Sequence, residues 1–334
     1  MRTFRDFMES ALYDPESGFY STRTQTADFY TAPELHPAFG AVLADRLAGL
    51  LRRVKASRPG ESLALVEAGC GNGTLAAAVA RRLREKHAAI AASLRFVLIE
   101  RSRRDLTDAV RRLTAFGLPV DACTSLERLP NFTGVLYSNE LFDALPAHLL
   151  EKKGAEMREV YVDASDNQVL GPLSSPDLAV HAEAISGALA DGERHAVNLA
   201  APRWLLEAAA RLNAGFLLTL DYGKRFTCET PNAPRAYRAH RVSSDLTVAP
   251  GKQDLTVPAD FTALIAAGDA AGAPTESYTS LSSFLIESGI ESFFEAAAGG
   301  DASSYKERAQ LKTLIHPEGM GESFKVLIQR KNAS

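Results

Sequence analysis

The sequence predicts an α/β protein built on a mostly parallel, seven-stranded, Rossmann-like sheet. Between residues 63 and 138, four short apolar segments alternate with helical segments, a pattern typical of βαβ units. A fifth segment, residues 216–221, is apolar almost throughout, as in strands that a parallel sheet buries on both faces. The chain has 334 residues and is 46% hydrophobic, which is enough for one large core or for a core with an added lobe.

The first sixty residues are expected to form a helical segment that a loop interrupts. Apolar side chains recur at helical spacing over residues 4–12 and again over residues 37–54. Between these helices lies an octet, residues 27–34 (ADFYTAPE), that fits neither the helical nor the strand period. We therefore predict an N-terminal helical segment over residues 1–60, with an irregular loop inside it.

A parallel core is expected to follow this segment. Right-handed crossovers between parallel strands place a ligand cleft at the carboxyl ends of the strands, so functional side chains are expected directly after each strand. The first four strands are predicted at residues 63–67, 96–100, 119–122 and 134–138, with helices at residues 74–87 and 103–116.

The second half of the chain combines an insertion with the remaining core elements. Residues 148–214 are expected to form an accessory region that covers the substrate, with a hairpin followed by two helices. Residues 224–257 show little periodicity and predict a long excursion. The predicted core therefore comprises residues 61–147 and 215–334, with later strands at 216–221, 275–279 and 324–328 and helices at 261–271, 280–288 and 303–315.

The composition argues against several classes of protein. A net charge of −4 and a pI near 6.0 argue against a nucleic-acid binder. No apolar run is long enough to insert into a membrane, and the N-terminus lacks the apolar region of a secretory signal, so we expect a cytoplasmic protein. The three scattered cysteines and His36, His148 and His316 show no spacing typical of a metal site.

The strongest motif lies where the first predicted strand turns into a helix, at residues 66–74 (VEAGCGNGT). Glycine permits a tight turn and a close approach of ligand to backbone, and the helix N-terminus offers free N–H groups. The dinucleotide pattern Gly-x-Gly-x-x-Gly would need glycine at position 74, where this chain has threonine, a plausible N-cap of the helix. An ordinary strand–helix turn without a ligand is the alternative. The predicted cofactor-binding residues here are Glu67, Gly69, Gly71, Gly73 and Thr74.

Two carboxylates favour a nucleoside ligand at this turn. A carboxylate at Glu67 suits a ligand with an ammonium and a sulfonium group better than one with a pyrophosphate. Glu100 ends the second strand, where an acidic residue can accept both ribose hydroxyls. Because S-adenosylmethionine (SAM) and NAD both carry a ribose, Glu100 does not choose between them.

The segment after the fourth strand, residues 138–146 (SNELFDALP), is expected to face the same cleft. Glu140 and Asp143, with Asn139 as a hydrogen-bonding neighbour, could hold a cationic nitrogen substrate and accept its proton, so these three residues are predicted to be catalytic. Alternatively, Asp143 caps a following helix and Glu140 is an exposed residue of its first turn. Asp221, at the end of the fifth strand, either orients the substrate or merely starts the next loop.

Several segments together resemble the MidA-like family of SAM-dependent methyltransferases. The matching stretches run nearly end to end, and the two most specific are DFYTAPEL at residues 28–35 and NELFDALP at residues 139–146. The resemblance implies a class I methyltransferase sheet and places the octet near the cofactor, with Asp28, Thr31, Pro33 and Glu34 as further SAM-binding residues. This chain has Ala27 where the family usually has glycine, which disfavours a left-handed turn there.

The resemblance also implies a reaction. Mitochondrial members of the family are complex I assembly factors that methylate an arginine of a complex I subunit. We therefore predict SAM-dependent methylation of a nitrogen, most plausibly an arginine of a protein partner such as a respiratory complex I subunit. The alternatives are a methyltransferase of the same fold that acts on a small molecule, and a non-catalytic assembly factor that binds SAM.

Overall fold

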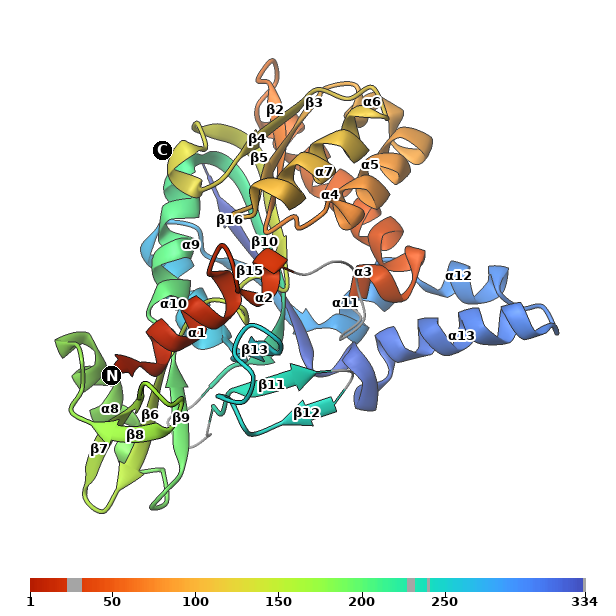
Figure 1. Ribbon diagram of the computed structural model, residues 1–334. Helices are drawn as coiled ribbons and strands as arrows, with labels where there is room; N and C mark the ends of the chain where they lie inside the picture. Colours follow the sequence, from red (N-terminus) through yellow and green to blue (C-terminus); the bar gives the residue numbers. More distant parts are fainter. Residues whose placement is uncertain (23–31, 227–231, 239–240, 333–334) are drawn as a thin grey trace. The chain divides into compact units, whose positions relative to one another are not determined.

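A computed structural model describes residues 1–22, 32–226, 232–238 and 241–332, and the chain divides into two compact units (Figure 1). The core unit comprises Thr31–Leu141, Leu205–Tyr222 and Ile265–Ser334, and the accessory unit comprises Met1–Tyr30, Phe142–Trp204 and Gly223–Leu264. The first helix and residues 223–264 thus belong to the accessory unit, whereas the sequence placed them in an N-terminal segment and in the core.

The core unit is an α/β structure around a mixed sheet. In the order β15-β16-β10-β5-β2-β3-β4, the five strands from β10 to β4 are parallel, and β16 runs antiparallel to both of its neighbours. Each segment predicted as a strand lies in this sheet. The strands are β2 (Leu63–Ala68), β3 (Leu94–Ile99), β4 (Val120–Cys123), β5 (Phe132–Asn139), β10 (Leu212–Lys224), β15 (Thr275–Ser280) and β16 (Phe324–Lys331).

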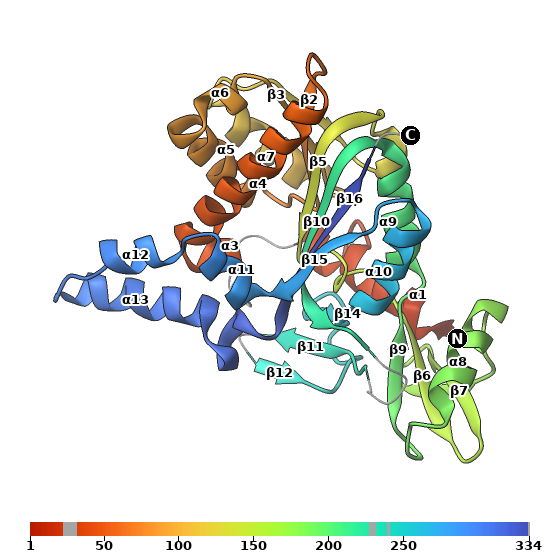
Figure 2. The same ribbon diagram turned by 180° about the vertical axis from the view of Figure 1, so that it is seen from behind.

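Helices cover both faces of the core sheet. Figures 1 and 2 show α4, α5 and α7 on one face and α9 on the other. The longest, α4 (Pro37–Ser57), buries Phe39, Val42, Leu43 and Leu47 at the helical spacing that predicted it. The other helices of this unit are α3 (Ala32–Leu35), α5 (Thr74–Lys86), α6 (Ala88–Ala91), α7 (Arg103–Thr114), η1 (Leu126–Arg128), α11 (Leu281–Glu287), α12 (Glu291–Ala296), α13 (Ala302–Ile315) and η2 (Pro317–Gly321), while α9 (Ala200–Arg211) and α10 (Phe261–Ala270) span both units.

The accessory unit contains two small antiparallel sheets. The larger has the order β1-β7-β6-β9, with β8 paired to β7. The antiparallel pair of β7 and β8 confirms the predicted hairpin. The smaller sheet, β12-β11-β13, lies in the predicted excursion. The elements are β1 (Arg2–Thr3), α1 (Phe4–Tyr13), α2 (Phe19–Thr22), β6 (His148–Lys153), β7 (Glu156–Val162), β8 (Gln168–Gly171), α8 (Pro176–Ser186), β9 (Arg194–Val197), β11 (Arg235–Arg238), β12 (Arg241–Ser243), β13 (Asp254–Thr256) and β14 (Ala259–Asp260), which pairs with the end of β10.

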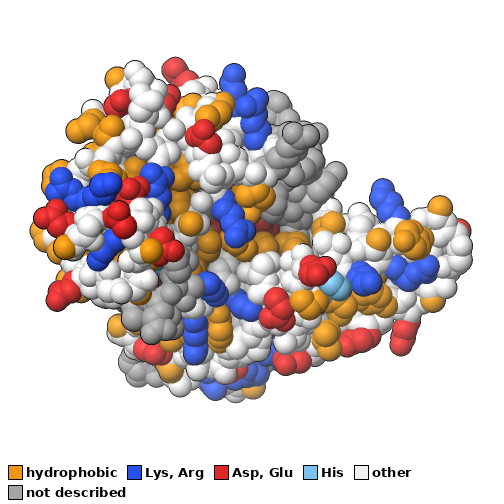
Figure 3. Space-filling view, turned by 90° about the horizontal axis from the view of Figure 1, so that it is seen from below, with side chains coloured by type: hydrophobic (Ala, Val, Ile, Leu, Met, Phe, Trp, Pro, Cys, Tyr) orange, Lys and Arg blue, Asp and Glu red, His pale blue; other side chains and the backbone are white. Residues whose placement is uncertain are grey.

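The described surface shows neither a membrane-spanning helix nor a single-sign charged face in the view of Figure 3. No helix in the described part of the chain is long and apolar enough to cross a membrane. In Figure 3, Lys and Arg side chains are interspersed with Asp and Glu side chains.

Two glycines of the core unit test how tightly its layers pack. Gly73 has a φ of 79°, and an added Cβ would lie 2.6 Å from the Cα of Ala109 on α7. Gly117 has a φ of 65°, but no described atom lies within 4 Å of an added Cβ. We expect Gly117→Ala to lower the free energy of unfolding by about 1 kcal/mol and Gly73→Ala by about 2–4 kcal/mol, because only Gly73 adds a steric clash to the strain. Urea unfolding of both variants measures the difference, and equal losses would contradict this packing.

Candidate active site

The glycine loop, residues 69–73, joins the end of β2 to the start of α5. Its three glycines all have left-handed backbone, with φ of 69° at Gly69, 50° at Gly71 and 79° at Gly73. A Cβ added at Gly69 would lie 3.0 Å from Cδ1 of Leu141, so this part of the loop packs against the residues that follow β5. A Cβ added at Gly71 would meet no described atom within 4 Å. The loop is therefore closed against the protein at Gly69 and Gly73 and open at Gly71, where a ligand has room to approach the backbone.

The start of α5 differs from the prediction. Gly73 occupies the N-cap position and Thr74 is the first helical residue, so the prediction of Thr74 as the N-cap is wrong. Oδ1 of Asn72 instead accepts hydrogen bonds from the Thr74 backbone N–H (3.1 Å) and from its hydroxyl group (2.7 Å). The asparagine thus satisfies an N–H group that the helix leaves open. Binding of a cofactor by Thr74 stays a prediction.

Glu100 connects the glycine loop to the end of the next strand. Its Oε2 accepts a hydrogen bond from the backbone N–H of Gly71 (2.9 Å), and its Oε1 accepts one from the backbone N–H of Ser102 (2.9 Å). Burial raises the pKa of Glu100, and these hydrogen bonds oppose the rise by favouring the carboxylate. The carboxyl group therefore holds the loop in place, and its predicted contact with ribose hydroxyls stays a prediction.

Glu67 lies beneath the glycine loop and is 3% exposed. On the neighbouring strand β5, Tyr137 stands directly opposite and donates its hydroxyl hydrogen to Oε2 of Glu67 at 2.6 Å. Burial raises the pKa of Glu67 to about 8, although the hydrogen bond from Tyr137 opposes the rise. Burial therefore favours the protonated form of Glu67 at neutral pH, whereas the ligand-binding role predicted for it is that of a carboxylate. Its predicted cofactor contact is not tested by this geometry.

The acceptor loop, residues 139–141, follows β5 and places Glu140 beside the glycine loop. Glu140 has a φ of 52°, a conformation that costs a non-glycine residue about 1–3 kcal/mol and that is concentrated at functional sites. Its backbone N–H donates to the carbonyl oxygen of Leu220 (3.0 Å). Its Oε1 accepts hydrogen bonds from Nδ2 of Asn139 (2.9 Å) and from the backbone N–H of Ala32 (3.3 Å). The structure thus brings together Asn139 and Glu140, two of the three predicted catalytic residues.

Asn139 presents an acceptor whose partner is not among the described residues. Its Nδ2 donates to Glu140, but its Oδ1 is buried and has no hydrogen-bond partner in the described part of the chain. Leaving such a group unpaired costs about 1–3 kcal/mol, so an N–H donor from a bound molecule would be stabilised there. The amide oxygen and the Glu140 carboxylate together favour a nitrogen-bearing, positively charged ligand.

A buried carboxylate fixes the acceptor loop from the neighbouring strand. Oδ2 of Asp221 accepts a hydrogen bond from the backbone N–H of Leu141 at 3.0 Å, and Asp221 is fully buried. Strand β10 continues to Lys224, so Asp221 lies within the strand and does not start a loop. We infer that Asp221 positions Leu141, and through it the neighbouring Glu140.

Asp143 belongs to the accessory unit, whereas Asn139 and Glu140, the other two predicted catalytic residues, belong to the core unit. Residues 141–147 contain no helix, so the alternative in which Asp143 caps a helix that begins with Glu140 is wrong. The Asp143 side chain is 7% exposed, and its backbone carbonyl accepts a hydrogen bond from the N–H of Val257 (2.8 Å). A catalytic role for Asp143 stays a prediction.

The octet is only partly described. Asp28 and Thr31 lie outside the described residues, so the structure gives no information on their predicted contacts with SAM. Pro33 and Glu34 lie in the short helix α3, which corrects the prediction of a loop at these positions. The residue before them, Ala32, donates its N–H to Glu140, so this turn lies next to the acceptor loop. Cofactor contacts of Pro33 and Glu34 stay predictions.

Cysteine and metal chemistry find no support in the described residues. Burial raises the pKa of the Cys70 thiol far above its usual range, which suppresses the thiolate that a nucleophile would need. Within the described ranges, no group of three or more His, Cys, Asp and Glu side chains is arranged to hold a metal ion.

The glycine loop after β2, Glu100 after β3 and the acceptor loop after β5 all lie at the carboxyl edge of the core sheet, the edge at which α/β enzymes of this class bind their ligands. Residues 42–279 match the model of a family described as "Putative S-adenosyl-L-methionine-dependent methyltransferase", and the chain belongs to this family. Its members use SAM, and the open side of the loop at Gly71 fits close approach of such a ligand to the backbone. This chain is therefore a SAM-dependent methyltransferase.

Two relatives that align with nearly the whole chain have names that are more specific than the family description. The mouse "Protein arginine methyltransferase NDUFAF7, mitochondrial" is 28% identical over 359 aligned residues, which cover 96% of this chain and 79% of that protein. The human protein of the same name is 26% identical, with 96% of this chain and 78% of that protein covered.

A solved structure shares the fold. A protein from Burkholderia thailandensis, crystallised with bound S-adenosyl-homocysteine, is 28% identical to this chain and superposes with a TM-score of 0.83. The match covers 99% of this chain and 89% of that protein. A structural relative thus binds the demethylated product of SAM.

The raised pKa of Glu67 predicts how stability depends on pH. The folded chain keeps this proton up to a pH of about 8, whereas the unfolded chain releases it near 4.5. The stabilisation that comes from this bound proton is fully present below about pH 4.5 and is lost as the pH rises through about 8. The loss lowers the free energy of unfolding by at most roughly 4–5 kcal/mol. We expect Glu67→Gln, which keeps an acceptor for Tyr137, to remove this fall.

Urea unfolding between pH 5 and pH 9 gives the free energy of unfolding of the parent protein and of Glu67→Gln as a function of pH. The difference between these two curves isolates Glu67, because the contributions of the other titrating groups cancel. Glu127→Gln, at an exposed position of the same unit, is the matched control and should follow the parent protein. Parallel curves for Glu67→Gln and the parent protein would show that Glu67 has an ordinary pKa in the folded state.

Proposed function

We propose that this methyltransferase transfers the methyl group of SAM to a guanidinium nitrogen of an arginine in a protein partner. The main support for the proposal is the buried Oδ1 of Asn139, which lies beside the Glu140 carboxylate and has no hydrogen-bond partner among the described residues. A guanidinium group has five N–H donors in a planar fork, so it can donate to an amide oxygen and a carboxylate at the same time. Two relatives named as protein arginine methyltransferases, matched over 96% of this chain, support the same acceptor.

The residues of the acceptor loop would act on the substrate. When bound, SAM supplies an electrophilic methyl group carried on a sulfonium. Glu140 would hold the guanidinium and keep the lone pair of the reacting nitrogen directed at that methyl group. Methylation of a protonated guanidinium nitrogen releases one proton, because the new N–C bond replaces an N–H bond. The Glu140 carboxylate is the nearest predicted acceptor for that proton.

The cofactor would lie along the strand ends. We propose that the mixed sheet is the class I methyltransferase sheet, with the glycine loop around the methionine part of SAM and Glu100 near its ribose. The strand order β15-β16-β10-β5-β2-β3-β4 and the left-handed glycine loop support this assignment. Several details remain predictions. They are a proton-accepting role for Asp143, a complex I subunit as partner, a cytoplasmic location, and cofactor contacts from Glu67, Thr74, Pro33, Glu34, Asp28 and Thr31. The animal relatives are named as mitochondrial proteins.

The proposal predicts both the product and the residue on which it depends. With SAM carrying a labelled methyl group and a lysate of acceptor proteins, we expect label in protein and, after hydrolysis, in methylarginine. Glu140→Ala should lower the transfer rate by about 10²-fold or more, because the orienting carboxylate is lost, while the dissociation constant of SAM changes little. Amino-acid analysis of the labelled protein and a calorimetric SAM titration measure the two quantities.

A second variant separates chemistry from loop strain. Glu140→Gly relaxes the left-handed backbone at φ 52° but also lacks the carboxylate, so it should be as inactive as Glu140→Ala. Label found only in small molecules, or only in amino acids other than arginine, would contradict the proposed acceptor. Equal loss of SAM affinity and of transfer in both variants would contradict the role given to Glu140.

A further inference from the structure

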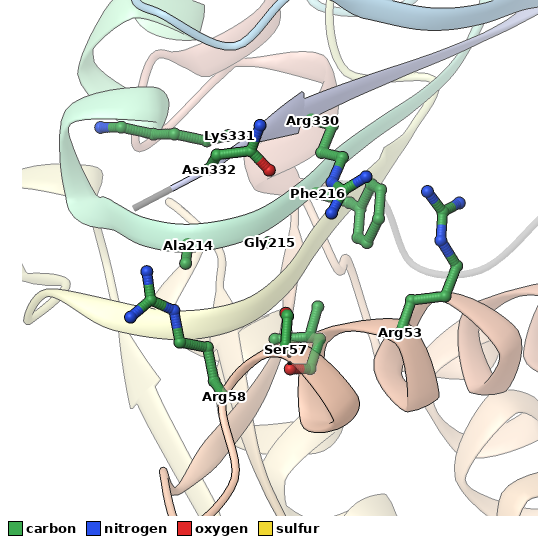
Figure 4. A pocket seen from close by; sticks show the side chains of 10 residues that line it. Arg53, Ser57, Arg58, Ala214, Gly215, Phe216, Arg330, Lys331 and Asn332 are labelled. Atoms are coloured by element: carbon green, nitrogen blue, oxygen red, sulfur yellow. Dashed lines mark hydrogen bonds between the residues drawn. The ribbon is translucent and has the colours of Figure 1, made fainter. Parts of the chain in front are cut away.

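A second concave site lies at the opposite end of the core sheet. The arginine pocket, with a volume of about 130 Å³, opens where β10 begins, β16 ends and α4 ends (Figure 4). Phe216, in its lining, is four strand positions before Leu220, which pairs with Asn139. At about 3.3 Å per residue, the two sites are roughly 13 Å apart along the strand. The residues on which the argument depends are Arg53, Arg58, Phe216, Arg330 and Asn332.

The lining of the pocket is strongly cationic. Its ten residues include four lysine and arginine side chains and no carboxylate. One of the four, Lys331, donates its ammonium hydrogen to the carbonyl oxygen of Ala209 (2.7 Å), and Figure 4 shows its side chain pointing away from the others. Three guanidinium groups therefore surround the space, from two different elements of the core unit.

An aromatic ring holds two of these guanidinium groups. Cζ of Arg53 lies 4.7 Å from the centroid of the Phe216 ring, and Cζ of Arg330 lies 5.8 Å from it. Arg53 also makes two hydrogen bonds of 2.6 Å to the carboxylate of Glu276, which is outside the pocket lining. These contacts restrict the side-chain rotamers, so less conformational entropy is lost when a ligand binds.

The other two arginines, Arg58 and Arg330, are less completely paired with carboxylates than Arg53. Arg330 forms no ion pair within 4.0 Å in the described part of the chain, although the Glu276 carboxylate that pairs with Arg53 also interacts with it electrostatically. The partner of Arg58 is Glu61 at 3.9 Å. Both members of that last pair are more than a third exposed, so solvent screens their attraction. Arg53 is already paired with Glu276, so Arg58 and Arg330 are the cations whose charge an anion bound in the pocket would neutralise.

The geometry points to a phosphate-binding site in the arginine pocket. Guanidinium groups match the oxygens of a phosphate with paired, charge-assisted hydrogen bonds, and the Asn332 amide adds a polar side chain to the lining. A volume of about 130 Å³ leaves room for a tetrahedral oxyanion. The phosphate could belong to a soluble molecule or to a lipid headgroup. This site does not depend on the proposed arginine acceptor, because it lies at the opposite strand ends.

Calorimetric titration of the full chain with inorganic phosphate, in a phosphate-free buffer of low ionic strength, tests the site. We expect saturable binding in the parent protein and a loss of affinity of about tenfold or more in Arg330→Gln and in Arg58→Gln, with a larger loss in the double variant. Arg112→Gln, on the exposed surface of α7, is the matched charge control and should bind phosphate like the parent protein.

Two further arms identify the source of the phosphate. Binding of a soluble phosphate monoester but not of phosphatidylglycerol vesicles would support a soluble ligand, whereas vesicle binding that the double variant loses would support a headgroup. Arg58 is at the exposed end of α4, so Arg58→Gln keeps the test valid if Arg330→Gln fails to fold. The proposal is overturned if no phosphate compound binds saturably, or if folded Arg58→Gln binds as tightly as the parent protein.

Discussion

The left-handed backbone of the glycine loop is the constraint on which the rest of the candidate active site depends. Three positive φ angles within five residues turn the chain back against Leu141 and leave a Cβ position at Gly71 with no described atom within 4 Å. Two carboxyl groups hold this arrangement: Glu100 accepts a hydrogen bond from the N–H of Gly71, and the buried Asp221 accepts one from the N–H of Leu141. Both acids thus hold the backbone in place, and the proposed substrate contact falls to Glu140.

The main elements of the fold could be predicted because their signals are local. Apolar runs such as residues 216–221 and the helical spacing of α4 lie within single elements, so the seven core strands and the main helices follow from periodicity. Strands β9 and β13 have only four and three residues, and they are stabilised by pairing with β6 and β11, which lie far from them in the sequence. Such pairing leaves no periodic signal in the chain.

Only those residues of the candidate site that directly follow a strand could be predicted from the sequence. Glu140 and Gly71 follow strands, and the rule that ligands bind at carboxyl edges brings them together. The role of Tyr137 could not be foreseen, because its contact with Glu67 depends on the register between β2 and β5 and on burial that raises a pKa. For the same reason Asp221 could not be distinguished from an ordinary loop residue, since its partner lies 80 positions away.

Calorimetric titration with SAM of the parent protein, Gly71→Ala and Gly117→Ala is the direct test of a cofactor site at the glycine loop. Both alanines strain a left-handed turn and neither meets protein within 4 Å in the described structure, but only position 71 faces the proposed cofactor. The account predicts saturable SAM binding in the parent protein, unchanged affinity in Gly117→Ala and a loss of about tenfold or more in Gly71→Ala. Absence of SAM binding in the folded parent protein, or equal affinity in all three proteins, would contradict a cofactor site at the glycine loop.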